Sequence, residues 1–150
     1  MSIALIITSQ DHPQITNKIL EQVIAALERN GQKYHHITVS RAADIPIIIT
    51  IAKDYYDHKS IIAIGAMIAS EADYRLKVTY EKVIHALYEI MLYDEIAISH
   101  FISFNSSIDE ALNNTKNAAI ELIHSHFSLM NLEEKIEGNI TDQNIKKYKH

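Results

Sequence analysis

A chain of 150 residues, of which 47% are hydrophobic and 22% charged, is long enough for one domain with a sizeable core. Its formal net charge of −5 argues against a nucleic-acid partner, because phosphate binding needs a basic face, and the lack of cysteine excludes disulfides and thiolate chemistry. Because the apolar runs are too short to span a bilayer and the N-terminus lacks a signal-peptide pattern, we expect a cytoplasmic protein without a membrane partner.

The first part of the chain alternates a strand, a helix and a strand. Residues 3–8 (IALIIT) form a β-branched apolar run, which is typical of a strand buried on both faces. Residues 16–30 carry apolar side chains at helical spacing, and Gly31 follows them, where glycine favours the end of a helix. Residues 35–40 (HHITVS) predict a second strand.

The middle of the chain continues this alternation. Asp44 is a candidate N-cap, and Pro46 lies near the start of a helix that is predicted to end at about Tyr56. Residues 60–69 (SIIAIGAMIA) predict a third strand, and residues 78–92 predict an amphipathic helix.

The last predicted units are a strand over residues 95–103 and a helix that ends near Phe127. Ser107 and Glu110, in SIDE, form a capping box: the serine hydroxyl accepts a helix N–H, and the glutamate reaches back to an N–H before the helix.

This order of elements predicts the α/β class, as a three-layer α/β/α sandwich around a four-stranded parallel sheet. Residues 1–130 are expected to form the single domain, and the polar residues 131–150 a C-terminal tail that is a frayed helix or a disordered end. In such sheets ligands bind beyond the carboxyl ends of the strands. The candidate segments are therefore residues 9–12, 41–44, 69–74 and 104–107.

Several segments at these strand ends, taken together, resemble the lumazine synthase family. The matching segments are AADIP (42–46), IIAIGAMI (61–68) leading into DYRLKV (73–78), and IAISHFIS (96–103) leading into SIDEAL (107–112). The resemblance covers residues 3–127 and implies a lumazine-synthase-like fold. It also implies 6,7-dimethyl-8-ribityllumazine synthase activity in riboflavin biosynthesis, in which 5-amino-6-ribitylaminouracil condenses with 3,4-dihydroxy-2-butanone 4-phosphate. No cofactor is implied, and the expected assembly is a homo-oligomer, a pentamer or a multiple of it, with sites shared between subunits.

The resemblance assigns substrate-binding positions in the first two loops. Gln10 and Asp11 stand where the family has an aromatic ring that stacks on the pyrimidine. Ala42 and Ala43 precede Asp44, which stands at the position of a ribityl-binding acid and is one methylene shorter.

The third loop is matched in its strand and altered beyond it. Ala66, Met67 and Ile68 match a stretch that holds the pyrimidine mostly through its backbone. Glu71 and Ala72 replace the phosphate-binding Gly-Thr of the family.

Three further positions complete the expected site. Tyr74 replaces the catalytic histidine, and Ser99 in the fourth strand is an expected substrate-binding residue. Asn114 replaces a phosphate-binding arginine, a loop of the family is missing after it, and Lys116 is the only cation nearby.

These replacements leave more than one function open. A phosphate dianion needs N–H donors and a cation, and proton transfer near neutral pH suits an imidazole better than a phenol. Holding two reactants side by side contributes about 7–11 kcal/mol, so a weak enzyme is one hypothesis. The alternative is a catalytically impaired homologue that acts as a flavin- or lumazine-binding or structural oligomeric protein. A third hypothesis is a flavodoxin-like regulator, in which Asp11, Asp44 and Asp73 loosely resemble a magnesium site.

Simpler roles are open for several of these residues. Asp44 is equally explained as a helix N-cap, Tyr74 as a packing or interface side chain, and Glu71 with Asp73 as a solvated turn. The nine histidines lack the spacing of a ligand cluster, so we predict no metal site.

Overall fold

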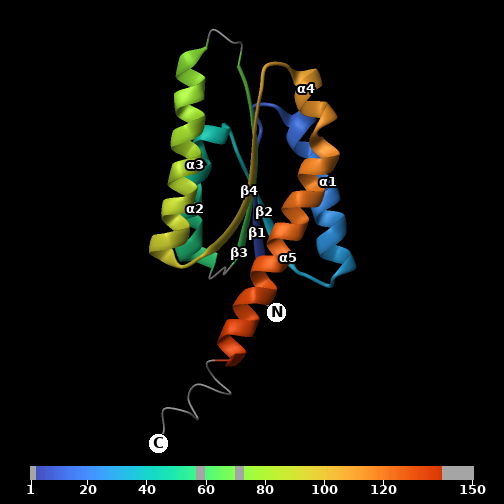
Figure 1. Cartoon of the computed structure of the whole chain (residues 1–150), viewed down its shortest axis with the longest axis vertical. Helices are drawn as coiled ribbons and strands as arrows, with labels where there is room; N and C mark the ends of the chain where they lie inside the picture. Colours follow the sequence, from blue (N-terminus) through green and yellow to red (C-terminus); the bar gives the residue numbers. More distant parts are fainter. Residues whose placement is uncertain (1–2, 57–59, 70–72, 140–150) are drawn as a thin grey trace, which may run out of the picture.

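The computed structural model is a three-layer sandwich with the sheet in the middle, as predicted (Figure 1). It describes residues 3–56, 60–69 and 73–139. The sheet is parallel throughout and has the strand order β2-β1-β3-β4. Its strands are β1 (Ala4–Ser9), β2 (Tyr34–Val39), β3 (Ser60–Ile68) and β4 (Ala97–Asn105).

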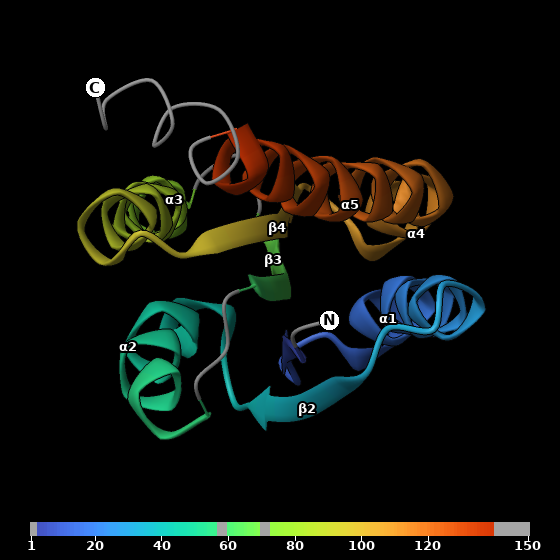
Figure 2. The ribbon, with the colours of Figure 1, turned by 90° about the horizontal axis from the view of Figure 1, so that it is seen from below.

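The helices divide between the two faces of the sheet (Figure 2). On one face lie α2 (Ile45–Tyr56) and α3 (Tyr74–Asp94), and a short 3-10 turn, η1 (Ala42–Asp44), precedes α2. On the other face lie α1 (Pro13–Arg29), α4 (Ile108–Asn113) and α5 (Thr115–Asn139). In the described part of the chain, no helix combines the length and the apolar character needed to cross a membrane.

The central strands are buried on both faces, as their continuous apolar runs predict. All six residues of β1 are buried. Because successive side chains of a strand alternate between faces, Leu5 and Ile7 join the core under α2 and α3, while Ile6 joins the core under α1 and α5. The sheet is therefore a rigid platform from which the loops at the carboxyl ends of the strands project.

Apolar periodicity placed several helix boundaries wrongly. The first helix begins at Pro13 rather than residue 16, and α3 begins at Tyr74 rather than residue 78. The early start of α3 has a local cause: the Asp73 carboxylate caps it by accepting a hydrogen bond from the Leu76 N–H at 3.2 Å.

The last predicted helix is two helices. It breaks at Asn114, the C-cap of α4, and the Thr115 hydroxyl donates to the Leu112 carbonyl at 2.9 Å across the break. The second helix continues to Asn139, beyond the expected end near Phe127. Its last turns project past the sheet (Figure 1), where no core imposes an apolar pattern and where the residues are still good helix formers.

Two helix-capping residues, one at a C-terminus and one at an N-terminus, were predicted correctly. Gly31 has a φ of 67°, and its N–H donates to the Glu28 carbonyl while the Gln32 N–H donates to the Leu27 carbonyl, which is a Schellman ending. At the start of α4 the Ser107 hydroxyl accepts the Glu110 N–H at 3.2 Å.

The second half of the predicted capping box differs from the expected form. The carboxylate of Glu110 reaches back to the N–H and the hydroxyl of Ser106, at 3.2 and 2.6 Å. The hydrogen bonds from Ser106 lower the pKa of Glu110. The reach-back therefore ends one residue earlier than the motif predicts.

Acid should weaken the fold through His126, which is 2% exposed and lies near Gln32. Burial lowers its pKa from 6.5 to about 4, so the imidazole is neutral in the fold while the unfolded chain binds a proton below about 6.5. The stability that this difference contributes is complete above pH 6.5 and is lost as the pH falls to about 4, by about 3 kcal/mol. Urea unfolding across this range should show a loss of stability in acid that is larger in wild type than in His126→Met by about 3 kcal/mol.

A matched control for this prediction is His124→Met, because His124 is exposed on the same helix. This variant should keep the slope of the wild type. Parallel pH profiles for wild type and His126→Met would contradict the assignment.

Candidate functional site

The carboxyl ends of β3 and β4 reach further than those of β1 and β2, at the top of Figure 1. The ladder between β1 and β3 ends with Thr8 opposite Ile64, whereas the ladder between β3 and β4 continues to Ile68 opposite Asn105. Residues 66–68 therefore extend beyond β1, and one edge of this stretch has no neighbouring strand in the described part of the chain.

The backbone direction shows which polar groups lie on that open edge. The N–H of Ala69 donates to the Asn105 carbonyl at 3.0 Å, so Ala69 faces β4. Because the N–H and C=O of successive strand residues alternate between the two edges, Met67 also faces β4, whereas Ala66 and Ile68 face the open edge. A strand edge of this kind offers donors and acceptors in a row. Side chains contribute less here, since Ala66 is 0% and Met67 3% exposed.

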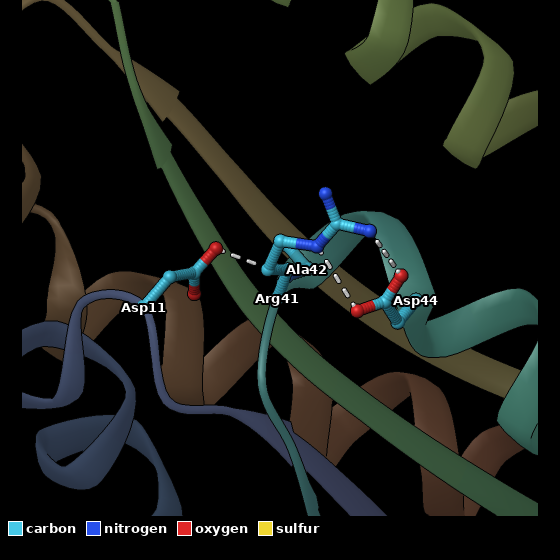
Figure 3. Close-up of polar contacts among 4 residues, drawn as sticks. All are labelled: Asp11, Arg41, Ala42 and Asp44. Atoms are coloured by element: carbon cyan, nitrogen blue, oxygen red, sulfur yellow. Dashed lines mark hydrogen bonds and ion pairs between the residues drawn. The ribbon is translucent and has the colours of Figure 1, made fainter.

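The turn η1 is fixed beside this edge from two sides. On one side, β3 packs so closely against η1 that a Cβ on Gly65 would lie 3.0 Å from the Cβ of Ala42. From the side, the carboxylate of Asp11 accepts the Ala42 N–H at 3.0 Å (Figure 3). The first and second loops, whose residues lie 31 positions apart, are thereby joined next to β3.

An ion pair spans η1. The Arg41 guanidinium donates through Nε and one Nη to the two carboxylate oxygens of Asp44, at 3.1 and 2.9 Å (Figure 3). These hydrogen bonds hold the pKa of Asp44 below its usual value and raise that of Arg41. Both carboxylate oxygens of Asp44 thus accept from Arg41 rather than from a helix N–H, so Asp44 does not act as the predicted N-cap. Arg41 lies in the candidate segment 41–44, but the sequence analysis assigned it no role; its only local signal is the i, i+3 spacing to an acid.

A cavity of about 460 Å³ lies between the starts of α3 and α4. Tyr74, 76% exposed, and Lys77, one helical turn later, line it from α3. Opposite them lie Asn105, Ser106 and the ionised Glu110, together with other lining residues from both elements. The exposure of Tyr74 speaks against a packing role within one subunit.

The structure brings together some predicted residues and separates others. Gln10 and Ala43 lie on the same loops as Asp11 and Asp44, with Gln10 exposed and Ala43 packed on the core. Ser99 lies within β4 opposite Ile62, is buried, and contacts the Ser125 hydroxyl of α5 at 3.4 Å.

Ser99 therefore lies apart from the strand ends. Asn114 is exposed and ends α4, on the opposite face of the sheet from α3. Glu71 and Ala72 fall outside the described residues.

The three acids of the magnesium hypothesis already have partners. Asp11 accepts from Ala42, Asp44 pairs with Arg41 and Asp73 caps α3. Within the described residues no group of three His, Cys, Asp or Glu side chains is arranged to hold a metal ion.

Comparisons with known proteins bear on this arrangement. The family described as 6,7-dimethyl-8-ribityllumazine synthase matches residues 2–134. The chain is 28% identical to a 6,7-dimethyl-8-ribityllumazine synthase of Bartonella bacilliformis, over 65% of each protein. It is 25% identical to synthase 1 of Mesorhizobium japonicum, over 65% of this chain and 62% of that protein. The matches thus span less than two thirds of these two relatives.

A longer match and a structural one complete the comparisons. The synthase of Thermotoga petrophila is 26% identical over 84% of this chain and 80% of its own length. Among solved structures, a flavodoxin from the domain Archaea aligns with 81% of this chain and 97% of its own at 10% identity, with a TM-score of 0.36, which is too low to bear on the argument. Since the family match covers most of the chain, the chain belongs to the 6,7-dimethyl-8-ribityllumazine synthase family.

Proposed function

We propose that the protein condenses 5-amino-6-ribitylaminouracil with 3,4-dihydroxy-2-butanone 4-phosphate to give 6,7-dimethyl-8-ribityllumazine. The observation that carries this proposal is the open edge of β3 at Ala66 and Ile68, with the acid Asp44 on a turn fixed beside it. Family membership supports it.

The open edge of β3 suits a pyrimidine ring. Uracil-like rings carry N–H donors and C=O acceptors along one side, and the backbone of Ala66 and Ile68 offers the complementary groups. A chain attached to a ring held there passes η1, because η1 packs on β3 at Gly65. Asp44 then accepts hydrogen bonds from ribityl hydroxyls, while Gln10 and Asp11 border the ring on the first loop.

Positioning accounts for most of the expected rate. The substrate amine attacks the ketone carbonyl and water is lost, phosphate is then eliminated, and the ring closes with loss of a second water. Holding the two reactants together contributes about 7–11 kcal/mol, so turnover does not depend on a strong acid–base residue. Tyr74 lines the cavity beyond β3 and β4, and we propose it as the side chain that moves protons.

The expected phosphate end of the site is poor in positive charge. Among the described residues that line the cavity, Lys77 is the one cation, and the carboxylates of Asp73 and Glu110 are also in its wall. Asn114, Glu71 and Ala72 are proposed for this end through the resemblance alone. We therefore expect slow turnover with a high KM for the butanone phosphate.

The test is formation of the fluorescent lumazine from both substrates. Purified protein should form it faster than the uncatalysed mixture, and Asp44→Ala should raise the KM for the pyrimidine. A rate of lumazine formation equal to that of the uncatalysed mixture would refute the proposal.

A catalytically impaired homologue that binds a flavin or lumazine is the second candidate, and the acidic wall of the cavity favours it. Riboflavin binding by calorimetry without lumazine formation would support it.

We also propose a homo-oligomer, a pentamer or a multiple of it. Large apolar side chains are exposed along α2 and α3, and native mass measurement tests this assembly. They include Ile47, Ile51, Tyr88, Leu92 and Tyr93.

A further inference from the structure

The Arg41–Asp44 pair keeps hydrogen-bonding capacity on both partners. A guanidinium has five N–H donors, and two of them go to Asp44, so three remain. A carboxylate has about four lone-pair sites, and Arg41 uses two. In Figure 3 one terminal nitrogen of Arg41 points away from Asp44 and contacts none of the residues drawn. The pair thus presents unused donors and unused acceptors side by side.

The pair is also held in place and accessible. The Asp44 N–H donates to the Arg41 carbonyl at 3.0 Å, which closes the turn, and Asp11 and Gly65 fix Ala42 from either side. The side chain of Arg41 is 70% exposed and that of Asp44 32% exposed, so a ligand in solution can reach both. Two groups on one rigid turn lose little conformational entropy when a ligand binds.

The charges of this cluster select against an anion. Asp11 and Asp44 carry two negative charges against the single positive charge of Arg41, and Asp11 is close enough to raise the pKa of Arg41. A phosphate or carboxylate on the ligand would meet a net negative site. A neutral hydroxyl, which donates and accepts at once, matches a carboxylate beside a guanidinium.

We infer that Arg41 is a specificity-determining residue that acts with Asp44 as a clamp for the neutral polyol chain of the pyrimidine substrate. One hydroxyl accepts from the unused N–H groups of Arg41, and a neighbouring hydroxyl donates to Asp44. This inference rests on the proposed function for the place of the ring at the edge of β3. The role arises from the arginine that stands three residues before the acid.

The experiment compares two unreactive ligands by calorimetry, 5-nitro-6-ribitylaminouracil and 5-nitro-6-methylaminouracil, which lacks the polyol. In Arg41→Ala the Kd for the ribityl ligand should rise about 10- to 100-fold, the range expected for lost hydrogen bonds to a charged group. The Kd for the methyl ligand should change by less than about 2-fold, since the ring contacts remain. Arg41→Lys should fall between, because an ammonium keeps the charge without the fork of donors.

Two controls separate recognition from folding. Arg29→Ala removes the same charge from the exposed end of α1 and should leave both Kd values unchanged. Urea midpoints of the Arg41 variants should lie close to that of wild type, because an exposed ion pair contributes little stability.

Several outcomes would overturn the inference. An equal rise in the Kd values of both ligands in Arg41→Ala would mean that Arg41 has a structural role. An unchanged or lower Kd for the ribityl ligand would mean that Arg41 only uses up hydrogen-bonding sites of Asp44. If ribitol alone bound as tightly as the ribityl ligand, the pyrimidine ring would contribute nothing to binding. Binding of neither ligand by wild type would refute both proposals.

The two proposals can also fail separately. Lumazine formation at the same rate and with the same KM in wild type and Arg41→Ala would refute only the clamp. A preference for the ribityl ligand that depends on Arg41, without any lumazine formation, would refute only the synthase activity.

Discussion

Tyr74→His should raise the rate of lumazine formation by about 10²-fold, the lower end of what a positioned acid–base group contributes. Tyr74 is the first residue of α3, is 76% exposed and lines the cavity beyond β3 and β4, so an imidazole fits there without repacking. A phenol ordinarily titrates near pH 10 and an imidazole near about 6.5, so the imidazole exchanges protons more readily at neutral pH. The gain should lie in kcat, with the KM of either substrate changed by less than about 3-fold.

The pH dependence of this variant distinguishes catalysis from an indirect effect. The N-terminal end of a helix carries a partial positive charge, which disfavours imidazolium and keeps the new histidine neutral. The kcat of Tyr74→His should therefore fall only below about pH 6. Tyr74→Phe measures what the phenol itself contributes, and Tyr93→His places an imidazole at the exposed far end of α3 as a control. A folded Tyr74→His protein no faster than wild type would show that the position does not act in proton transfer.

Gly65→Val should lower the free energy of unfolding by about 1–3 kcal/mol and abolish pyrimidine binding. A Cβ on Gly65 would lie 3.0 Å from the Cβ of Ala42, and 3.1 Å from the Cδ1 atoms of Ile45 and Ile102. The isoleucine ends can rotate away, whereas the Cβ of Ala42 is attached to a turn that Asp11 holds in place. The added side chain must therefore push η1 off β3, and the turn carries Asp44 with it. Urea unfolding and calorimetry with the ribityl ligand measure the two losses.

Two further variants test this reading of Gly65. Gly138→Ala, in α5, has no atom within 4 Å of the new Cβ and should cost nothing, since alanine is the better helix former. In the cycle Gly65→Ala with Ala42→Gly, removing the nearest atom should make the double variant less destabilised than the sum of the single ones. Strict additivity would mean that the contact with η1 is not the cause.

Local patterns in the sequence were sufficient for the architecture. The apolar runs of β1 and β3 predicted buried parallel strands, and the glycine at position 31 predicted the end of α1. Such features are encoded within a few residues, because strand and helix periodicities and turn preferences are properties of short segments. Boundaries were less well predicted where a single polar side chain decides them, as Asp73 does for α3.

The candidate site was predicted only in part, because its geometry depends on contacts between distant segments. That the loops after β1, β2 and β3 would meet followed from the parallel sheet. Two contacts were not predictable, because each depends on how closely the loops pack. They are the hydrogen bond from Ala42 to Asp11 and the close packing of η1 against Gly65. The sequence by itself thus determined the order of strands and helices along the chain and the edge of the sheet at which the candidate site lies. Only the tertiary structure decided that Arg41 pairs with Asp44 beside an open strand edge, because that pairing requires a backbone turn fixed by residues far away in the chain.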